Sequence, residues 1–221
     1  MAKTEHYFTK FEEKEFYHVY NRTVDKSPLF ANQGNYVYFL HRLDFYLSDF
    51  INVYTYCLLG NHFHLLIEIK EEISIRANIL KFEFENPNKI LSKKSNKFAN
   101  DKLVHDIVSH QFKKFFQSYS MSFNKQQNRI GTLFQKPFKR AIVDDNNYFT
   151  NLIQYIHQNP QKHGIIDDFR NYEWSSYQRI LLEKPTKLFK NQVISWFGNK
   201  QEYINFHNNF IALPDNLYLG D

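Results

Sequence analysis

Residues 51–69, INVYTYCLLGNHFHLLIEI, decide the fold. Two runs rich in β-branched and aromatic residues, 51–59 and 62–69, are separated only by Gly60 and Asn61, a strong hairpin turn signal. Apolar residues alternate along the second run, and this period of two predicts one buried face: Phe63, Leu65, Ile67 and Ile69. The stretch therefore predicts an antiparallel hairpin with one face in the core.

The segments on either side complete an α+β pattern. Residues 16–22 (FYHVYNR) alternate like a strand, and residues 34–47 have helical spacing. Farther along, we expect a helix over about 104–124, a strand over 131–143 and a helix through 148–159. The order strand, helix, hairpin, helix, strand, helix predicts a ferredoxin-like antiparallel sheet covered by helices.

Local chemistry predicts where three of these elements begin or end. Pro137 cannot donate to a β-ladder, so its strand should be an edge or contain a bulge. Asp144 and Asp145 are good N-cap residues for the following helix. Pro160 should end that helix.

We expect one main domain over 1–177 and a C-terminal extension over 178–221. Residues of about 70–103 turn polar, with ENPNK and SKKSNK, so we expect an exposed insertion there. The extension should form short helices that pack on the core, and no role is assigned to it.

Composition and charge limit the class of protein. The 221 residues are 43% hydrophobic and 23% charged, which is typical of a folded domain. A net charge of +5 and a pI of about 9.0 favour an anionic partner. The single cysteine, Cys57, excludes an internal disulfide and a thiolate-rich zinc site. With no signal peptide or membrane span in the sequence, we expect a soluble cytoplasmic protein, associated with the nucleoid if its partner is DNA.

His62 and His64 are the first candidate functional residues. They lie two apart on a predicted strand, so both imidazoles share the face opposite the buried one. Imidazole is the commonest nitrogen ligand for divalent transition metals, and such a pair is suited to grip one. In a chain with ten histidines, a chance pair is the alternative.

Tyr155 and Asn159 are the second candidate pair. Being four apart on a predicted helix, they lie on one helical face about one turn from each other. The alternatives are packing for Tyr155, one of 15 tyrosines, and helix termination for Asn159, which precedes a proline.

Taken together, the two pairs point to phosphodiester chemistry. A metal ion offsets negative charge on a scissile phosphate, and tyrosine is a nucleophile whose phosphate ester conserves the energy of the broken bond. A histidine pair on a sheet under a helix that carries Tyr155 therefore predicts cleavage through a covalent phosphotyrosine.

GNHFHLLIEI and YIHQNPQKHGII together resemble motifs of the single-tyrosine HUH transposases, named for a His-hydrophobic-His motif, and of their REP-associated tyrosine transposase branch in particular. The similarity extends to YHVYNRTVDKSPLF, GTLFQKPFKRAIV and WSSY, and it spans roughly residues 16–177.

The resemblance implies an enzyme that cleaves and rejoins single-stranded DNA beside a hairpin, using Mg or Mn and a 5′-phosphotyrosine intermediate. Carried over by position, His62, His64 and Asn159 would hold the metal, and Tyr155 would be the nucleophile. His157 should point elsewhere, because it lies only two residues after Tyr155. The protein would act as a monomer or homodimer on a REP-like hairpin or an element end.

Basic residues along the chain are candidates for contacts with DNA phosphates. A solvated surface charge is the alternative for each. The candidates are Arg22, Lys113, Lys114, Lys136, Lys139, Arg140, Lys162 and His163.

Two other functions fit the same sequence. A domesticated relative would bind DNA hairpins with little or no catalysis, and a ferredoxin-like fold would also suit an RNA-binding protein. The target hairpin, the metal used in the cell and the pairing of chains at the active site are left open by the sequence.

Overall fold

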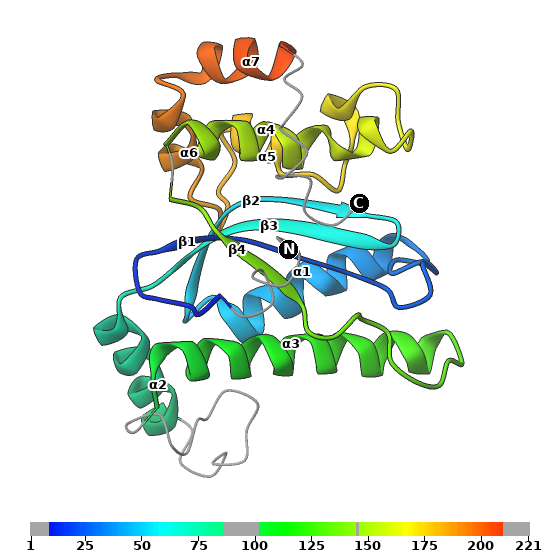
Figure 1. Cartoon of the computed structure of the whole chain (residues 1–221), viewed down its shortest axis with the longest axis vertical. Coiled ribbons are helices and arrows are strands. Elements are labelled where there is room, and N and C mark those ends of the chain that lie inside the picture. Colours follow the sequence, from blue (N-terminus) through cyan, green and yellow to red (C-terminus); the bar gives the residue numbers. More distant parts are fainter. Residues whose placement is uncertain (1–8, 86–101, 145, 210–221) are drawn as a thin grey trace.

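A four-stranded antiparallel sheet carries helices on both of its faces (Figure 1). The computed structural model describes residues 9–85, 102–144 and 146–209. The predicted α+β class, with an antiparallel sheet covered by helices, is confirmed. The finer ferredoxin-like description stays a prediction.

The sheet has the strand order β2-β3-β1-β4. Its strands are β1 (Phe16–Arg22), β2 (Ile51–Leu59), β3 (His62–Ile69) and β4 (Lys139–Ile142). The first three strands have the bounds that the sequence predicted. Gly60 and Asn61 alone connect β2 to β3, so the predicted hairpin is confirmed.

Two long helices, α1 (Gln33–Leu47) and α3 (Val104–Gln126), cover one face of the sheet, below it in Figure 1. Asn32 and Asn35 form a capping box that begins α1. The alternating apolar residues of β3 are buried in the same core as the two helices: Phe63, Leu65, Ile67 and Ile69. The face of β3 that carries His62 and His64 is thus the opposite one.

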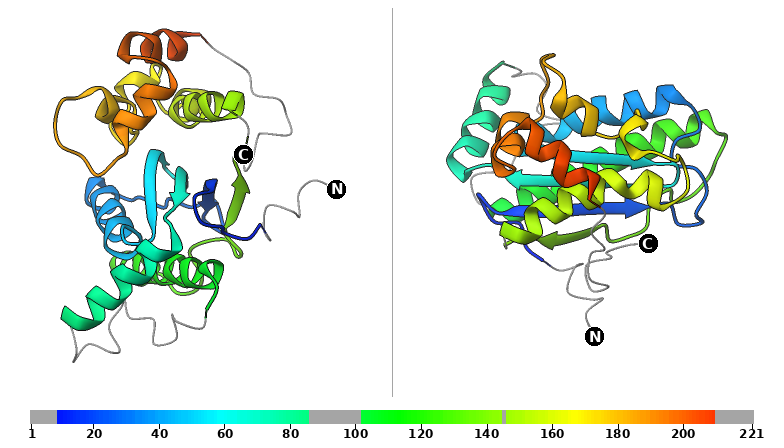
Figure 2. Two further views of the ribbon diagram at one scale, coloured as in Figure 1. Left: turned by 90° about the vertical axis from the view of Figure 1, so that its left-hand side faces the viewer. Right: turned by 90° about the horizontal axis from the view of Figure 1, so that it is seen from above.

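That opposite face is covered by α4 (Asn146–Lys162), and one further helix, α7, lies over α4 on the side away from the sheet (Figure 2). Leu152, Ile153 and Ile156 fasten α4 in an apolar core with residues of β2 and β3. The chain after α4 forms short helices, as predicted: η3 (Phe169–Asn171), α5 (Tyr177–Leu181), α6 (Lys190–Trp196) and α7 (Lys200–Asn208). Of these, α6 contacts β2 beside α4, and α7 lies over α4. Because it lies between the sheet and α7, α4 is buried on more than one side.

The prediction that Pro160 ends the last core helix is wrong. Pro160 lies inside α4, which continues to Lys162, and the amide of His163 donates to the carbonyl oxygen of Asn159 over 2.9 Å. A proline removes one helical hydrogen bond, here the one to the carbonyl oxygen of Ile156, but the turn can continue around it. Asn159 is therefore held inside a helix.

Two other predicted elements also need correction. Only 139–142 of the expected strand over 131–143 form a strand, and an isolated bridge joins Phe134 to Thr23. The polar insertion begins with a helix, α2 (Glu72–Glu85), because Ile75 and Ile79 lie four apart and enter the core. The rest of that insertion over 86–101, and the predicted N-cap residue Asp145, lie outside the described residues.

Among the helices that the structure describes, none has both the length and the apolar character that crossing a bilayer requires.

Candidate active site

His62 and His64 lie at the turn end of β3, on the sheet face under α4. Their ring centroids are 5.3 Å apart, and the rings are nearly perpendicular. His64 is buried, whereas His62 is half-buried. The period of two along β3 thus brings both imidazoles to one place, as the spacing predicts.

Each of the two rings is oriented through its Nδ1 atom. In His62, Nδ1 lies 2.6 Å from Oδ1 of Asn61, the turn residue before it. An amide oxygen only accepts, so Nδ1 of His62 carries the proton and Nε2 carries a lone pair. In His64, Nδ1 lies 2.9 Å from Nε2 of His18 on β1. Both rings therefore have Nε2 as the nitrogen suited to bind a metal ion.

The helix α4 brings Tyr155 to His64 and carries Asn159 one turn farther along. The ring of Tyr155 lies edge-on to His64, with centroids 5.7 Å apart. Asn159, one turn later, is 0% exposed, and within the described residues neither its Oδ1 nor its Nδ2 has a hydrogen-bond partner. A buried amide left in this way costs about 1–3 kcal/mol for each unpaired group, so it calls for an explanation, such as a ligand.

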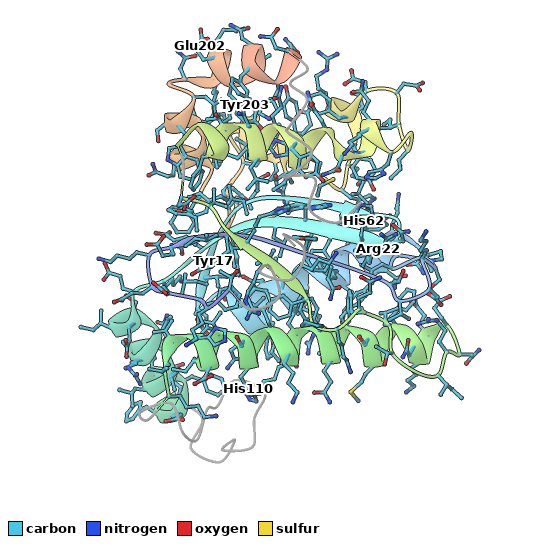
Figure 3. All side chains as sticks on the ribbon, in the orientation of Figure 1. Tyr17, Arg22, His62, His110, Glu202 and Tyr203 are labelled. Carbon is cyan, nitrogen blue, oxygen red and sulfur yellow. The ribbon has the colours of Figure 1, made fainter. Side chains whose placement is uncertain are left out.

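Three of the predicted cationic residues lie beside this site. The Nζ atom of Lys162 is 5.2 Å from the ring centre of Tyr155, and the ring of His163 is 5.1 Å from that of His62. Arg22 is the cross-strand partner of His62, and Figure 3 shows the two residues together at one end of the sheet. The site thus combines imidazoles, a phenol, an amide and positive charge.

Of the other predicted basic residues, Lys139 lies at the edge of the site, and the rest lie farther away or are buried. Lys139 shares a small cavity with Arg22 and His62. Lys113 and Lys136 line a groove of about 630 Å³ between α3 and residues 131–138, and this groove has no acidic residue among its lining. Lys114 is partly buried on α3, and desolvation lowers its pKa.

Arg140 does not present its charge to solvent. It is 7% exposed, its guanidinium lies over the rings of Phe11 and Phe138, and its Nε donates to the carbonyl oxygen of Thr9. We therefore leave Arg140 out of the candidate DNA surface. Phe138 is local in sequence, but Phe11 and the carbonyl group of Thr9 are distant in sequence, so local sequence does not show this burial.

Sequence reasoning missed His18 and Tyr20, which share the site face of β1. The ring of Tyr20 stacks on His64 with centroids 5.7 Å apart, the same separation as for Tyr155. The alternation within FYHVYNR already places His18 and Tyr20 on one face. What the sequence lacked was the β1–β3 register, which pairs Tyr20 with His64.

His157 points away from the site, as expected from its place two residues after Tyr155. Its Nε2 lies 2.6 Å from Thr55 Oγ1 and 2.8 Å from Ser176 Oγ, and its Nδ1 lies 2.9 Å from His207 Nε2. Burial lowers the pKa of His157 well below its usual value and that of His207 to about 4. We call this group the outer cluster (Thr55, His157, Ser176 and His207). The three histidines of the sheet face, together with Asn159 of α4, are called the sheet-side cluster (His18, His62, His64 and Asn159).

The sheet-side cluster fits a weakly held divalent metal ion. Among the described residues, no three His, Cys, Asp or Glu side chains gather in a way that could hold a metal. Two imidazole nitrogens and an amide oxygen form a neutral donor set, which suits Mn²⁺ better than Mg²⁺. Asn159, buried with its amide unsatisfied, is the observation that favours such a ligand.

Comparisons with known proteins identify two relatives, although no family model matches the chain. A Haemophilus influenzae protein whose name describes a REP-associated tyrosine transposase is 25% identical over 153 residues, covering 61% of this chain and 72% of the relative. A solved structure of a REP-associated tyrosine transposase bound to a REP hairpin shares the fold, with a TM-score of 0.56 and 13% identity over 81% of this chain and 87% of that one. The resemblance drawn from the motifs is confirmed: in sequence and in fold, this chain is similar to REP-associated tyrosine transposases.

Proposed function

We propose that this protein is a metal-dependent endonuclease and strand transferase for single-stranded DNA, acting through a 5′-phosphotyrosine at Tyr155. The observation that carries the proposal is that the Tyr155 ring contacts His64 and that the unsatisfied amide of Asn159 is buried one turn farther along α4, within one chain. The similarity to proteins named tyrosine transposases supports the same reaction.

His62, His64 and Asn159 would hold the metal ion through two Nε2 atoms and Oδ1. When bound, Mg²⁺ or Mn²⁺ would polarise a non-bridging phosphate oxygen and offset the charge of the transition state. Phosphate oxygens and water must complete a set of only three protein ligands, so we expect weak binding without DNA and a preference for Mn²⁺ in vitro.

The chain's own residues supply the nucleophile and the positive charge. The Tyr155 oxygen attacks the phosphorus and forms an O–P bond while the bond to the 3′ oxygen breaks. The phenolic proton passes to solvent, and the departing 3′ oxygen takes up a proton to become a hydroxyl. A 3′ hydroxyl can later reverse these steps and join strands. Lys162, beside the Tyr155 ring, would attract the phosphate.

The proposed substrate is a DNA strand next to a hairpin, either REP-like or an element end. The solved relative is bound to a REP hairpin, which supports this choice. Arg22 and His163 would contact phosphates at the cleaved position, while Lys139, Lys136, Lys113 and Lys114 would act on flanking DNA. We further propose a monomer or homodimer acting in the cytoplasm on the nucleoid.

Trapping the covalent intermediate tests the proposal. A suicide oligonucleotide, nicked so that the released piece diffuses away, should leave DNA attached to the protein in the presence of Mn²⁺. Tyr155→Phe should abolish the adduct while retaining DNA binding. Tyr20→Phe is the matched control, because both phenol rings lie 5.7 Å from His64, and it should still form the adduct. An adduct in Tyr155→Phe would disprove the assignment.

A second candidate function is hairpin binding without catalysis. The low exposure of Tyr155, 6%, favours it, since a buried phenol must become accessible before it attacks a phosphate. A wild-type protein that binds REP-like hairpins but forms no adduct with either Mg²⁺ or Mn²⁺ would support this alternative.

A further inference from the structure

The buried contact between His18 and His64 joins two neighbouring strands on the site face. His18 is 0% exposed, and its Nε2 lies 2.9 Å from Nδ1 of His64. The two residues are diagonal neighbours, because His64 is the direct partner of Tyr20, two residues after His18. Their rings are nearly parallel, with centroids 5.1 Å apart. The contact thus restrains the rotation of the His64 ring.

We propose that His18 is a positioning residue, which holds His64 in the orientation and tautomer needed to bind the metal ion. This inference rests on the proposed function. It assigns a role to a side chain that would touch neither the ion nor the DNA.

The chemistry of imidazole gives the direction of this hydrogen bond. A ring that binds a metal through Nε2 must keep its lone pair there, so its proton lies on Nδ1. Nδ1 of His64 then donates to Nε2 of His18, which accepts when His18 carries its own proton on Nδ1. Partners of this kind fix the ligand ring and raise its basicity. Asn61 has the same relation to His62 through its amide oxygen.

The geometry argues against His18 as a further ligand. Its Nε2 lies at hydrogen-bond distance from Nδ1 of His64. A nitrogen that points at another ligand's ring in this way cannot at the same time point at an ion held by the other side of that ring. His18 therefore acts through His64.

Two substitutions separate positioning from simple packing. In His18→Gln the amide oxygen falls near the place of Nε2 and can still accept from His64. In His18→Phe the ring shape is kept, but the acceptor is lost. The probe is Mn²⁺ alone, titrated into protein without DNA and followed by the electron paramagnetic resonance signal of free Mn²⁺.

We expect His18→Phe to weaken Mn²⁺ binding roughly 10- to 100-fold, and His18→Gln to weaken it less than about threefold. Nitrogen-15 spectra of the metal-free wild type should show His64 protonated on Nδ1. This measurement needs neither variant, so it applies even if His18→Phe fails to fold.

The inference about His18 is overturned if wild type and His18→Phe bind Mn²⁺ equally, if His18→Gln binds as weakly as His18→Phe, or if the His64 proton is found on Nε2. In each of these cases wild-type Mn²⁺ binding still leaves the proposed function standing. A wild type that binds no Mn²⁺, with or without hairpin DNA, overturns both.

Discussion

Two groups of buried histidines lie on different sides of α4, and they differ in how their polar atoms are satisfied. In the outer cluster, His157 uses both ring nitrogens, with Thr55 and Ser176 at one and His207 at the other. In the sheet-side cluster, Asn159 is equally buried, yet neither atom of its amide has a hydrogen-bond partner among the described residues.

The difference separates a group whose hydrogen bonds stabilise the fold from a group with an unsatisfied buried amide, which we propose to bind a ligand. A closed network recovers the cost of burying polar atoms, so it adds rigidity and needs nothing further. A buried amide without partners leaves that cost in place until a ligand binds. Both clusters contain histidines, so residue type alone could not distinguish them, but hydrogen-bond satisfaction does.

Breaking the outer cluster should have the largest effect on stability. His157→Leu removes one ring and leaves Thr55, Ser176 and His207 with lost bonds, so we expect the free energy of unfolding to fall by about 3 kcal/mol. Urea denaturation at neutral pH measures it. The control is Asn159→Leu on the sheet side, which should cost the metal-free protein far less because it removes an unsatisfied amide. If the free energy of unfolding falls equally in His157→Leu and Asn159→Leu, the two clusters do not differ in their contribution to stability.

Metal addition should affect only the sheet-side cluster. Mn²⁺ at a concentration 100 times its Kd should raise the free energy of unfolding by about 2.7 kcal/mol, since the ion binds only the folded state. Asn159→Leu should lose most of this increment, and Thr55→Val in the outer cluster should keep it. Thermal unfolding with Mn²⁺ and then with excess chelator gives the comparison. A full increment in Asn159→Leu would exclude Asn159 as a ligand.

Acid should weaken the outer cluster. Burial lowers the pKa of His207 from 6.5 to about 4, so the unfolded state binds more protons between these values. The stability that depends on neutral His207 is complete above pH 6.5 and is lost as pH falls toward 4. The free energy of unfolding should therefore fall by about 2 kcal/mol between pH 8 and pH 5. Urea denaturation across this range should show the decline, and His207→Gln should make it less steep, while His157, whose pKa burial also lowers, still contributes. An unchanged pH dependence in that variant would place the titration elsewhere.

Local periodicity predicted most of the fold. The alternation within 16–22 and the two β-rich runs on either side of Gly60 and Asn61 predicted the bounds of the first three strands and the hairpin. Two local predictions were wrong. Pro160 was expected to end a helix, but α4 is packed on two sides and continues past it. Residues 72–85 were expected to be an exposed polar segment, but they form a helix that buries Ile75 and Ile79. Tertiary packing overrides a local preference of a few kcal/mol.

The candidate site was predictable where its residues share one element, and hidden where they do not. Spacing alone pairs His62 with His64 and Tyr155 with Asn159. The contact of His18 with His64 depends on the register of two strands, and the burial of Arg140 depends on Phe11, far away in sequence. The helix α7 showed its role only in three dimensions, as the cover on the side of α4 away from the sheet (Figure 2).

The smallest expected effect comes from replacing the amide nitrogen of Asn159 by oxygen, which tests directly whether this side chain binds the metal ion. Asn159→Asp keeps the shape but supplies a charged oxygen, which Mg²⁺ prefers, so we expect Mg²⁺ to bind about tenfold more tightly. The metal-free variant should be less stable, because the charge is buried. Isothermal titration measures the affinity. Gln158→Glu is the control, because it adds the same charge one residue earlier on α4, where Gln158 donates to the carbonyl oxygen of His207.

If Asn159→Asp and Gln158→Glu both bind Mg²⁺ more tightly, the gain comes from the added negative charge and not from a ligand at Asn159. Affinity unchanged in Asn159→Asp but lost in His62→Ala would mean that the ion binds the imidazoles without the amide. In that case Nδ2 of Asn159, rather than Oδ1, would be the functional atom, because it could donate to a phosphate oxygen of the bound strand. The unsatisfied amide would then bind DNA rather than the metal ion. The contrast between the two clusters would still hold, with DNA as the ligand of the sheet-side cluster.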